Sequence, residues 1–176
     1  MDRAAPPQPK TAFLGLGSNL GDRHAHLRAA LDALDAWPGC HLERASDVVE
    51  TPAMYVTDQP AFLNLCAQIT TTLSPEALLD AALEIERRLG RVRTIDKGPR
   101  TIDLDLLFYD DLILHTPRLD LPHPLLHERT FVLIPMSQLA PALLHPERGE
   151  SIVAMLQNTQ TPTPGLTATP CPFKKG

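Results

Sequence analysis

The chain has 176 residues, enough for one domain with a hydrophobic core, and its 43% hydrophobic and 21% charged residues are ordinary for a globular protein. No apolar run approaches the ~18 residues of a membrane span, and a net charge of −5 argues against a general nucleic-acid or anionic-membrane binder. Because the N-terminal residues lack an apolar core of secretory-signal length, and Cys40, Cys66 and Cys171 lack disulfide or zinc-site spacing, we expect a cytoplasmic protein.

The first half of the chain predicts strands around a helix. Residues 11–17 form a short apolar stretch punctuated by glycine, typical of a buried strand. After a turn, apolar residues recur at helical spacing as far as Trp37, and Pro38-Gly39 ends the helix. Residues 41–51 are a strand candidate, followed by a proline-containing loop to Pro60.

The second half repeats the alternation. Residues 62–73 are rich in β-branched side chains and predict a strand. Ser74 and Pro75 then open a helix as N-cap and first residue, and Gly90 closes it. With a last strand at 101–109, the order is β-α-β-β-α-β. This order predicts a ferredoxin-like α+β core, with an antiparallel sheet and helices on one face.

The remaining segments extend this core. Residues 1–10 look like a loose arm, and residues 158–176, rich in proline and threonine, look like a flexible or surface-hugging tail. Residues 123–141 predict a loop with short helical pieces, and residues 150–158 a short closing helix. We therefore expect one domain over residues 11–157, with extra C-terminal elements.

Two carboxylates mark the last predicted strand. Asp103 and Asp105 alternate with apolar residues, so they share a face about 6.6 Å apart, together with Leu107 and Tyr109. Like charges at that distance raise each other's pKa unless a cation lies between them, and Mg²⁺ prefers carboxylate oxygens. The alternative is an ordinary solvent-facing strand, which the apolar neighbours on that face disfavour.

Basic residues are concentrated just before this strand. Six of the 16 Lys and Arg residues lie from Arg87 to Arg100, beside one acid, Asp96. The cluster indicates either a localised anionic ligand or a solvated helix end with a basic loop. Arg91, Arg93 and Arg100 have the fork geometry that matches phosphate oxygens, so with the carboxylate pair they favour phosphoryl chemistry.

Three other features need partners or space. Glu86 falls inside the apolar arc of the helix over 74–89, where it either reaches solvent or contacts a ligand. His123 lies between two prolines, and Arg129 nearby favours phosphate contact over a zinc pair with His127. The glycines of GLGSNLG, residues 15–21, fit neither a dinucleotide-binding nor a P-loop pattern, so we expect them to provide backbone clearance and a tight turn.

The motifs together resemble a known family. The stretches FLGLGSNLGDR, ETPAMYVTDQPAFLN, EIERRLGRVR, GPRTIDLDLLFYDD and LPHPLLHERTFVLIPMSQLAP occur in the order found in 6-hydroxymethyl-7,8-dihydropterin pyrophosphokinases, over residues 11 to 157. The resemblance implies a ferredoxin-like fold. It also implies transfer of the β,γ-pyrophosphoryl group of ATP, the co-substrate, to the pterin hydroxymethyl oxygen, giving AMP in folate biosynthesis.

The resemblance also implies residue roles. Asp103 and Asp105 would hold two Mg²⁺ ions, while Arg91 and Arg100 would stabilise charge in the transition state. Loops near 52–60 and 91–99 would close over the substrates, although Lys97 stands where the best-known member has tryptophan. Further ATP contacts would come from Glu86, Arg93, Arg118, His123 and Arg129, and pterin contacts from Thr51, Pro52, Met54, Phe62, Asn64 and Phe131.

Two other functions use the same residues. A metal-dependent phosphohydrolase would need the acids and arginines but no pterin, and a non-catalytic ferredoxin-like binding module would need neither metal nor ATP turnover. We expect a monomer whose partners are the small molecules ATP and the pterin, with no nucleic acid or membrane.

Overall fold

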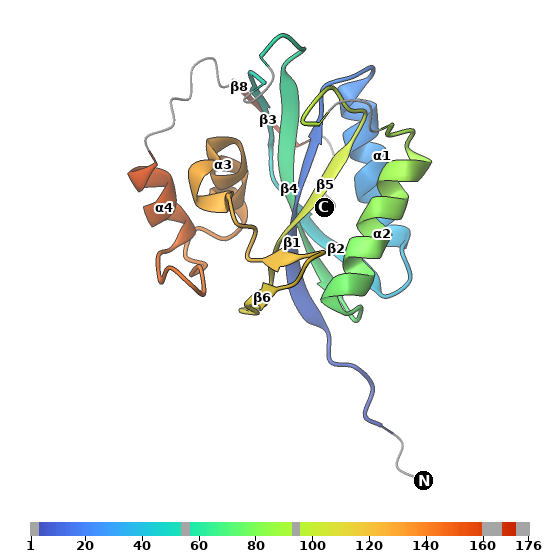
Figure 1. The fold of residues 1–176 in the computed structure, drawn as a ribbon, viewed down its shortest axis with the longest axis vertical. Coiled ribbons are helices and arrows are strands. Elements are labelled where there is room, and N and C mark those ends of the chain that lie inside the picture. Colours follow the sequence, from blue (N-terminus) through green and yellow to red (C-terminus); the bar gives the residue numbers. More distant parts are fainter. Residues whose placement is uncertain (1–3, 54–56, 93–95, 160–166, 172–176) are drawn as a thin grey trace.

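The structure, a computed structural model, describes residues 4–53, 57–92, 96–159 and 167–171. Its centre is a six-stranded sheet in which every neighbouring pair is antiparallel, in the order β5-β1-β4-β3-β8, with β2 also paired to β4 (Figure 1). The strands are β1 (Lys10–Ser18), β2 (Cys40–Ala45), β3 (Val48–Thr51), β4 (Phe62–Thr71), β5 (Asp103–Tyr109) and β8 (Thr167–Thr169).

The predicted β-α-β-β-α-β order and the ferredoxin-like α+β core are confirmed. Helix α1 (Arg23–Ala36) begins where the Asp22 side chain accepts the Ala25 N–H at 3.0 Å. Helix α2 (Pro75–Arg88) begins as expected, with Ser74 accepting the Ala77 N–H at 3.2 Å, and Gly90 beyond its end has a φ of +83°. The local capping signals in the sequence therefore set both helix starts.

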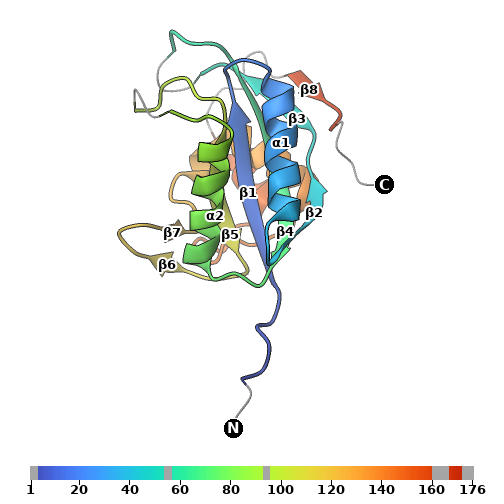
Figure 2. The same cartoon turned by 90° about the vertical axis from the view of Figure 1, so that its right-hand side faces the viewer.

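The two helices of the core lie on one face of the sheet, as expected, and the C-terminal helices cover the other face. Helices α1 and α2 cover one face, and α3 (Thr130–Leu139) and α4 (Ile152–Asn158) lie on the other (Figures 1 and 2). Each side has its own apolar cluster: Leu14, Leu31 and Ile85 belong to the first, and Phe108 and Leu133 to the second. A short 3-10 turn, η1 (Leu126–Glu128), precedes α3, and a hairpin of β6 (Leu114–His115) and β7 (Asp120–Leu121) follows β5.

The single strand expected over 41–51 is two strands. Ser46 and Asp47 interrupt it, and the chain continues along the same partner strand, β4. The Ser46 hydroxyl accepts the Cys66 N–H at 2.9 Å, and the Ser46 N–H donates to the Cys66 carbonyl at 2.8 Å. Ser46 in the break is therefore still hydrogen-bonded to β4, a contact that periodicity along one strand cannot reveal.

The strand with the two acids also differs from simple alternation. Phe13 pairs with Phe108 and Leu14 with Leu106, so Leu107 has no partner residue in β1 and forms a bulge. Leu107 stays on the side of the acids, but Tyr109 lies in the α1–α2 cluster and donates its hydroxyl to the Leu73 carbonyl at 2.6 Å. The expectation that Tyr109 shares the acidic face is wrong because the bulge shifts the alternation by one residue.

The C-terminal tail contributes a strand to the sheet. Residues 167–169 pair with β3, although the sequence there showed no strand period. The three side chains are exposed, so no apolar alternation marks this edge strand.

No helix in the described residues is long and apolar enough to cross a membrane.

Candidate active site

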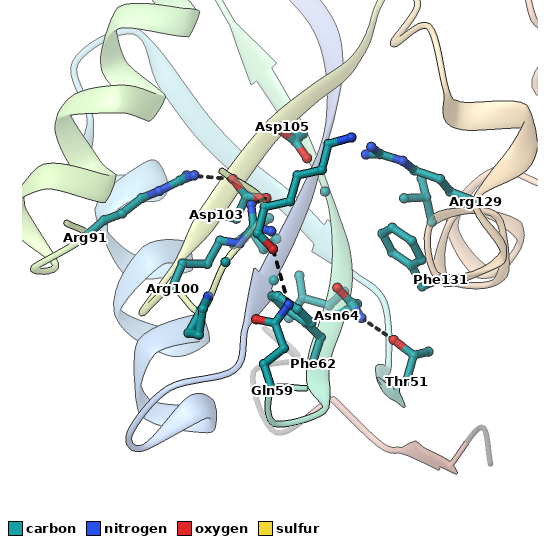
Figure 3. Close-up of a pocket in the computed structure, with 18 of the residues that line it drawn as sticks. Thr51, Gln59, Phe62, Asn64, Arg91, Arg100, Asp103, Asp105, Arg129 and Phe131 are labelled. Carbon is teal, nitrogen blue, oxygen red and sulfur yellow. Dashed lines mark hydrogen bonds and ion pairs between the residues drawn. The ribbon is translucent and has the colours of Figure 1, made fainter. Parts of the chain in front are cut away.

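A cavity of about 490 Å³ opens on the sheet face opposite α1 and α2, and its walls come from distant parts of the chain (Figure 3). Gly15 and Gly17 of β1 line it, and they pair with Asp105 and Asp103 of β5. Position 17 has no room for a larger side chain, because a Cβ on Gly17 would lie 3.0 Å from Asn64 Oδ1. The predicted backbone clearance therefore serves the cavity floor.

Two arginines hold Asp103. Arg91 Nη1 lies 2.6 Å from Asp103 Oδ1, and Arg100 Nη1 lies 3.2 Å from Asp103 Oδ2. Arg91 Nη1 also lies 2.7 Å from Glu86 Oε1, so Arg91 bridges two carboxylates. Both arginines retain a buried Nε atom with no hydrogen-bond partner among the described residues. Each therefore keeps one buried donor that its ion pairs do not use.

Glu86 does not reach solvent. Its side chain is 4% exposed, and Oε1 accepts the Leu104 N–H at 2.8 Å. The carboxylate thus ties α2 to the start of β5 and fixes Arg91 between itself and Asp103. Glu86 lies behind the cavity wall, so its clearest effect is to orient Arg91.

Asp105 differs from Asp103. Burial, and then the nearby Asp103 charge, raise the pKa of Asp105 to about 7, against the lowering effect of the Arg129 charge. Among the described residues, Asp105 has no hydrogen-bond or ion-pair partner. A buried carboxyl in this state would be stabilised as its anion by a cation, so the pair fits a hard divalent ion such as Mg²⁺.

The rest of a metal's coordination would come from elsewhere. No group of three or more His, Cys, Asp or Glu side chains that could hold a metal occurs among the residues that the structure describes. Mg²⁺ at nucleotide sites is typically bound by one or two carboxylates, and water and phosphate oxygens fill its other coordination positions. The Asp103–Asp105 pair fits this donor set.

His123 and Arg129 form the opposite wall. Burial, and then the Arg129 charge, lowers the pKa of His123 to about 4, so the imidazole is neutral near pH 7. Its Nδ1 accepts the Leu125 N–H at 3.2 Å, which leaves the ring hydrogen on Nε2. The Arg129 guanidinium lies 5.6 Å from the centroid of the Phe131 ring. This wall combines a fixed neutral donor, a cation and an aromatic surface.

The third side of the cavity is suited to a flat polar ring. Asn64 is 7% exposed and donates from Nδ2 to Thr51 Oγ1 at 2.9 Å, which fixes its amide plane (Figure 3). Phe62 lies beneath the Arg100 guanidinium, 5.2 Å from ring centroid to Cζ. Phe131 faces the cavity from the start of α3.

The structure brings most of the predicted site residues together. Glu86 lies just behind the wall, and Arg118 lies outside the cavity, where it bonds Asp80 at 2.6 Å. Met54 and Arg93 fall outside the described residues. The predicted residues that line the cavity are Thr51, Pro52, Phe62, Asn64, Arg91, Arg100, Asp103, Asp105, His123, Arg129 and Phe131.

Sequence reasoning missed two amides that connect the surrounding loops. Asn19 is 2% exposed; its Oδ1 accepts the Arg100 N–H at 2.9 Å, and its Nδ2 donates to Gln59 Oε1 at 2.9 Å. Gln59 in turn donates to the Lys97 carbonyl at 3.2 Å. Asn19 lies in a glycine-flanked turn, which by sequence indicates a turn residue and nothing more.

Comparison with known sequences gives a family. The profile of the family described as 7,8-dihydro-6-hydroxymethylpterin-pyrophosphokinase (HPPK) matches residues 13–141. The 2-amino-4-hydroxy-6-hydroxymethyldihydropteridine pyrophosphokinase of Methylorubrum extorquens is 46% identical over 133 residues, which cover 76% of this chain and 84% of that protein. The folic acid synthesis protein fol1 of Schizosaccharomyces pombe is 44% identical over 137 residues. That match covers 78% of this chain but 19% of fol1, so the chain spans about a fifth of that relative.

Solved structures give the fold. A crystal structure of Plasmodium falciparum HPPK-DHPS with pteroate superposes with a TM-score of 0.70 at 14% identity, covering 88% of this chain and 43% of that one. At this identity the likeness concerns the fold alone.

Proposed function

We propose a reaction for this chain from one premise: it belongs to the 7,8-dihydro-6-hydroxymethylpterin-pyrophosphokinase family, whose named members are diphosphokinases of folate synthesis. The proposed reaction is Mg²⁺-dependent transfer of the β,γ-pyrophosphoryl group of ATP to the hydroxymethyl oxygen of 6-hydroxymethyl-7,8-dihydropterin, with release of AMP. The observation that carries it is one cavity containing a carboxylate pair, phosphate-matching arginines and a fixed amide beside an aromatic ring.

The arginines bind the phosphates. Arg91 and Arg100 both line the cavity, and their ion pairs with Asp103 hold the two guanidinium groups in place. Arg129 adds positive charge from the opposite wall. Guanidinium groups fixed by carboxylates are preorganised, so they stabilise charge that develops on the transferring group at little reorganisation cost.

Asp103 and Asp105 would hold the metal, for which we propose two ions. When bound, Mg²⁺ neutralises phosphate charge and aligns the attacking and leaving oxygens. The residues contribute the placement: both carboxylates lie on β5, directly beside the glycine floor formed by β1. Asp103 is ion-paired with two arginines, whereas Asp105 has no hydrogen-bond or ion-pair partner among the described residues. Asp105 is therefore the carboxylate more available to a cation.

The remaining wall would select the pterin. Asn64, held by Thr51, presents an amide to the hydrogen-bonding edge of the ring. Phe131 and Phe62 provide aromatic surfaces for stacking and packing. Since none of the described residues is placed as a general base, we propose that the chain accelerates the reaction by positioning and electrostatics.

We further propose one catalytic domain over residues 11–157, a cytoplasmic location and a monomeric state. Cys40 and Cys66 are free thiols, the usual state of cysteines in a reducing compartment. The net charge of −5 supports small-molecule rather than nucleic-acid partners.

An isotope experiment separates the proposed transferase from the phosphohydrolase. ATP labelled at the γ-phosphorus would be incubated with the protein, Mg²⁺ and the dihydropterin, and the products separated by chromatography. We expect the label in a pterin pyrophosphate. Label in inorganic phosphate or pyrophosphate, with the pterin unchanged, would favour the hydrolase; no label transfer together with pterin binding would favour the binding module.

A further inference from the structure

The C-terminal strand β8 lies along the outer edge of β3. Thr169, Ala168 and Thr167 pair with Val48, Val49 and Glu50, and both views place β8 beside β3 (Figures 1 and 2). Without β8, β3 would be a four-residue edge strand held on one side by β4. The family match ends at residue 141, so this strand lies outside the matched region.

Asp47 connects the tail to a second element. Its Oδ1 accepts the Cys171 N–H at 3.0 Å, and its own N–H donates to Gln138 Oε1 at 2.8 Å. Gln138 belongs to α3, the helix that carries Phe131 at its other end. Cys171 is 5% exposed, so the tail is buried where it reaches Asp47. The tail, β3 and α3 thus meet at one residue.

These contacts lie at one end of the cavity. β3 ends at Thr51, which bonds Asn64 and lines the cavity, and α3 provides Phe131. The acids of β5 lie at the other edge of the sheet, separated from β3 by β1 and β4. Displacement of β8 would therefore loosen the wall of Thr51, Asn64 and Phe131 and leave the positions of Asp103 and Asp105 intact.

We propose that β8 and Cys171 form a positioning strap that holds this wall in the shape that binds the pterin. The inference rests on the proposed function, since it assigns the strapped wall to the pterin and the β5 wall to ATP. By linkage, if the attached strap favours pterin binding, bound pterin must favour the attached strap to the same degree.

The first test is a chain that ends at Thr159, compared with the full chain and with a control that lacks residues 1–9. Loss of three paired residues and one buried hydrogen bond should raise the KM for the pterin about tenfold. The kcat and the KM for ATP should stay within about twofold, and the control should match the full chain. A shortened chain with the full-length KM for the pterin would overturn the strap.

The second test uses the intact chain, so it does not depend on the folding of a variant. Alkylation of Cys171 by iodoacetamide, located by peptide mass spectrometry, reports detachment of the strap. Saturating pterin should slow labelling of Cys171 several-fold and leave Cys40, at the far end of β4, unchanged. Equal Cys171 rates with and without pterin would overturn the inference.

The two hypotheses fail in different ways. A full chain that transfers pyrophosphate, but whose shortened form is kinetically identical, contradicts the strap alone. A full chain that neither transfers pyrophosphate nor binds the pterin contradicts the proposed function, and with it the assignment of the strapped wall to that ligand.

Discussion

The two acids on β5 are chemically unlike, although they are neighbours on one face. Asp103 forms ion pairs with Arg91 and Arg100. Asp105 has no such partner among the described residues, and burial and the Asp103 charge raise its pKa to about 7. One carboxylate therefore organises the arginines, and the other is a buried site for positive charge. The sequence predicted the shared face from alternation, but the division of roles depends on α2, which alternation along a strand does not describe.

Asp105→Ala should lower kcat by about a thousandfold or more, since metal-held charge stabilisation is worth several kcal/mol. The fold should survive. The raised pKa means that ionising Asp105 destabilises the folded state. The protonated Asp105 side chain therefore contributes folding stability that is fully present below about pH 4 and is lost as the pH rises through about 7. Metal-free Asp105→Ala at pH 8 should therefore melt no lower than wild type. Turnover kinetics and circular dichroism melts test both statements, and wild-type turnover would contradict the metal assignment.

Arg100→Ala should lower kcat at least about a hundredfold, because it removes a preorganised donor from the transferring group. Pterin binding should change much less, since among the described residues of the wall assigned to the pterin, Arg100 contacts the Phe62 ring. Arg148→Ala is the matched control, because Arg148 pairs with Glu150 at 3.0 Å and does not line the cavity. A variant with wild-type kcat and a raised KM for the pterin would contradict a role in the transition state.

At the scale of elements, α1 and α2 were predictable, whereas the strand irregularities and the ten-residue helix α3, expected as a loop with short helical pieces, were not. Asp22 and Ser74 cap their helices through contacts three residues away, so the local sequence contains the signal. The Leu107 bulge and the break at Ser46 are instead set by the partner strands β1 and β4. Pairing partners lie far away in sequence, and a one-residue shift there moved Tyr109 to the opposite face.

The floor of the cavity gives a prediction for β1. Gly17→Ala would place a methyl group 3.0 Å from Asn64 Oδ1, which must shift to accommodate it, so the KM for the pterin should rise about tenfold or more. Gly15→Ala is the control, because its new Cβ would meet Leu107 at an ordinary 3.6 Å. Steady-state kinetics of the two variants test this prediction. Equal KM values for the pterin in Gly17→Ala and Gly15→Ala would show that Asn64 is not held as described.

At the scale of the whole molecule, the site is assembled by contacts between residues that are far apart in the sequence. Asn19 joins Arg100 and Gln59, which are distant in the chain, and Glu86 on α2 holds Arg91 toward β5. The motifs located the chemistry because each acid and arginine lies in a local pattern. The amide contacts and the strand β8 arise only when the sheet and its two helical layers are packed.

The fold and the metal should be separable. Apolar clusters on both faces of the sheet stabilise the protein, and no cluster of three or more metal-ligating side chains is found in its described regions. Removing divalent ions with a chelator should therefore abolish turnover and leave the nucleotide-free melting temperature within about 1 °C. Calorimetry with and without chelator checks this, and a large fall in melting temperature would indicate a structural metal.

Nucleotide product analysis tests the central claim most directly. The protein would be mixed with ATP, Mg²⁺ and 6-hydroxymethyl-7,8-dihydropterin, with parallel reactions that lack the pterin or contain a chelator. We predict AMP, in amounts equal to the pterin consumed, and only when both pterin and Mg²⁺ are present. Formation of ADP, or nucleotide turnover that is independent of the pterin, would contradict pyrophosphoryl transfer at this site.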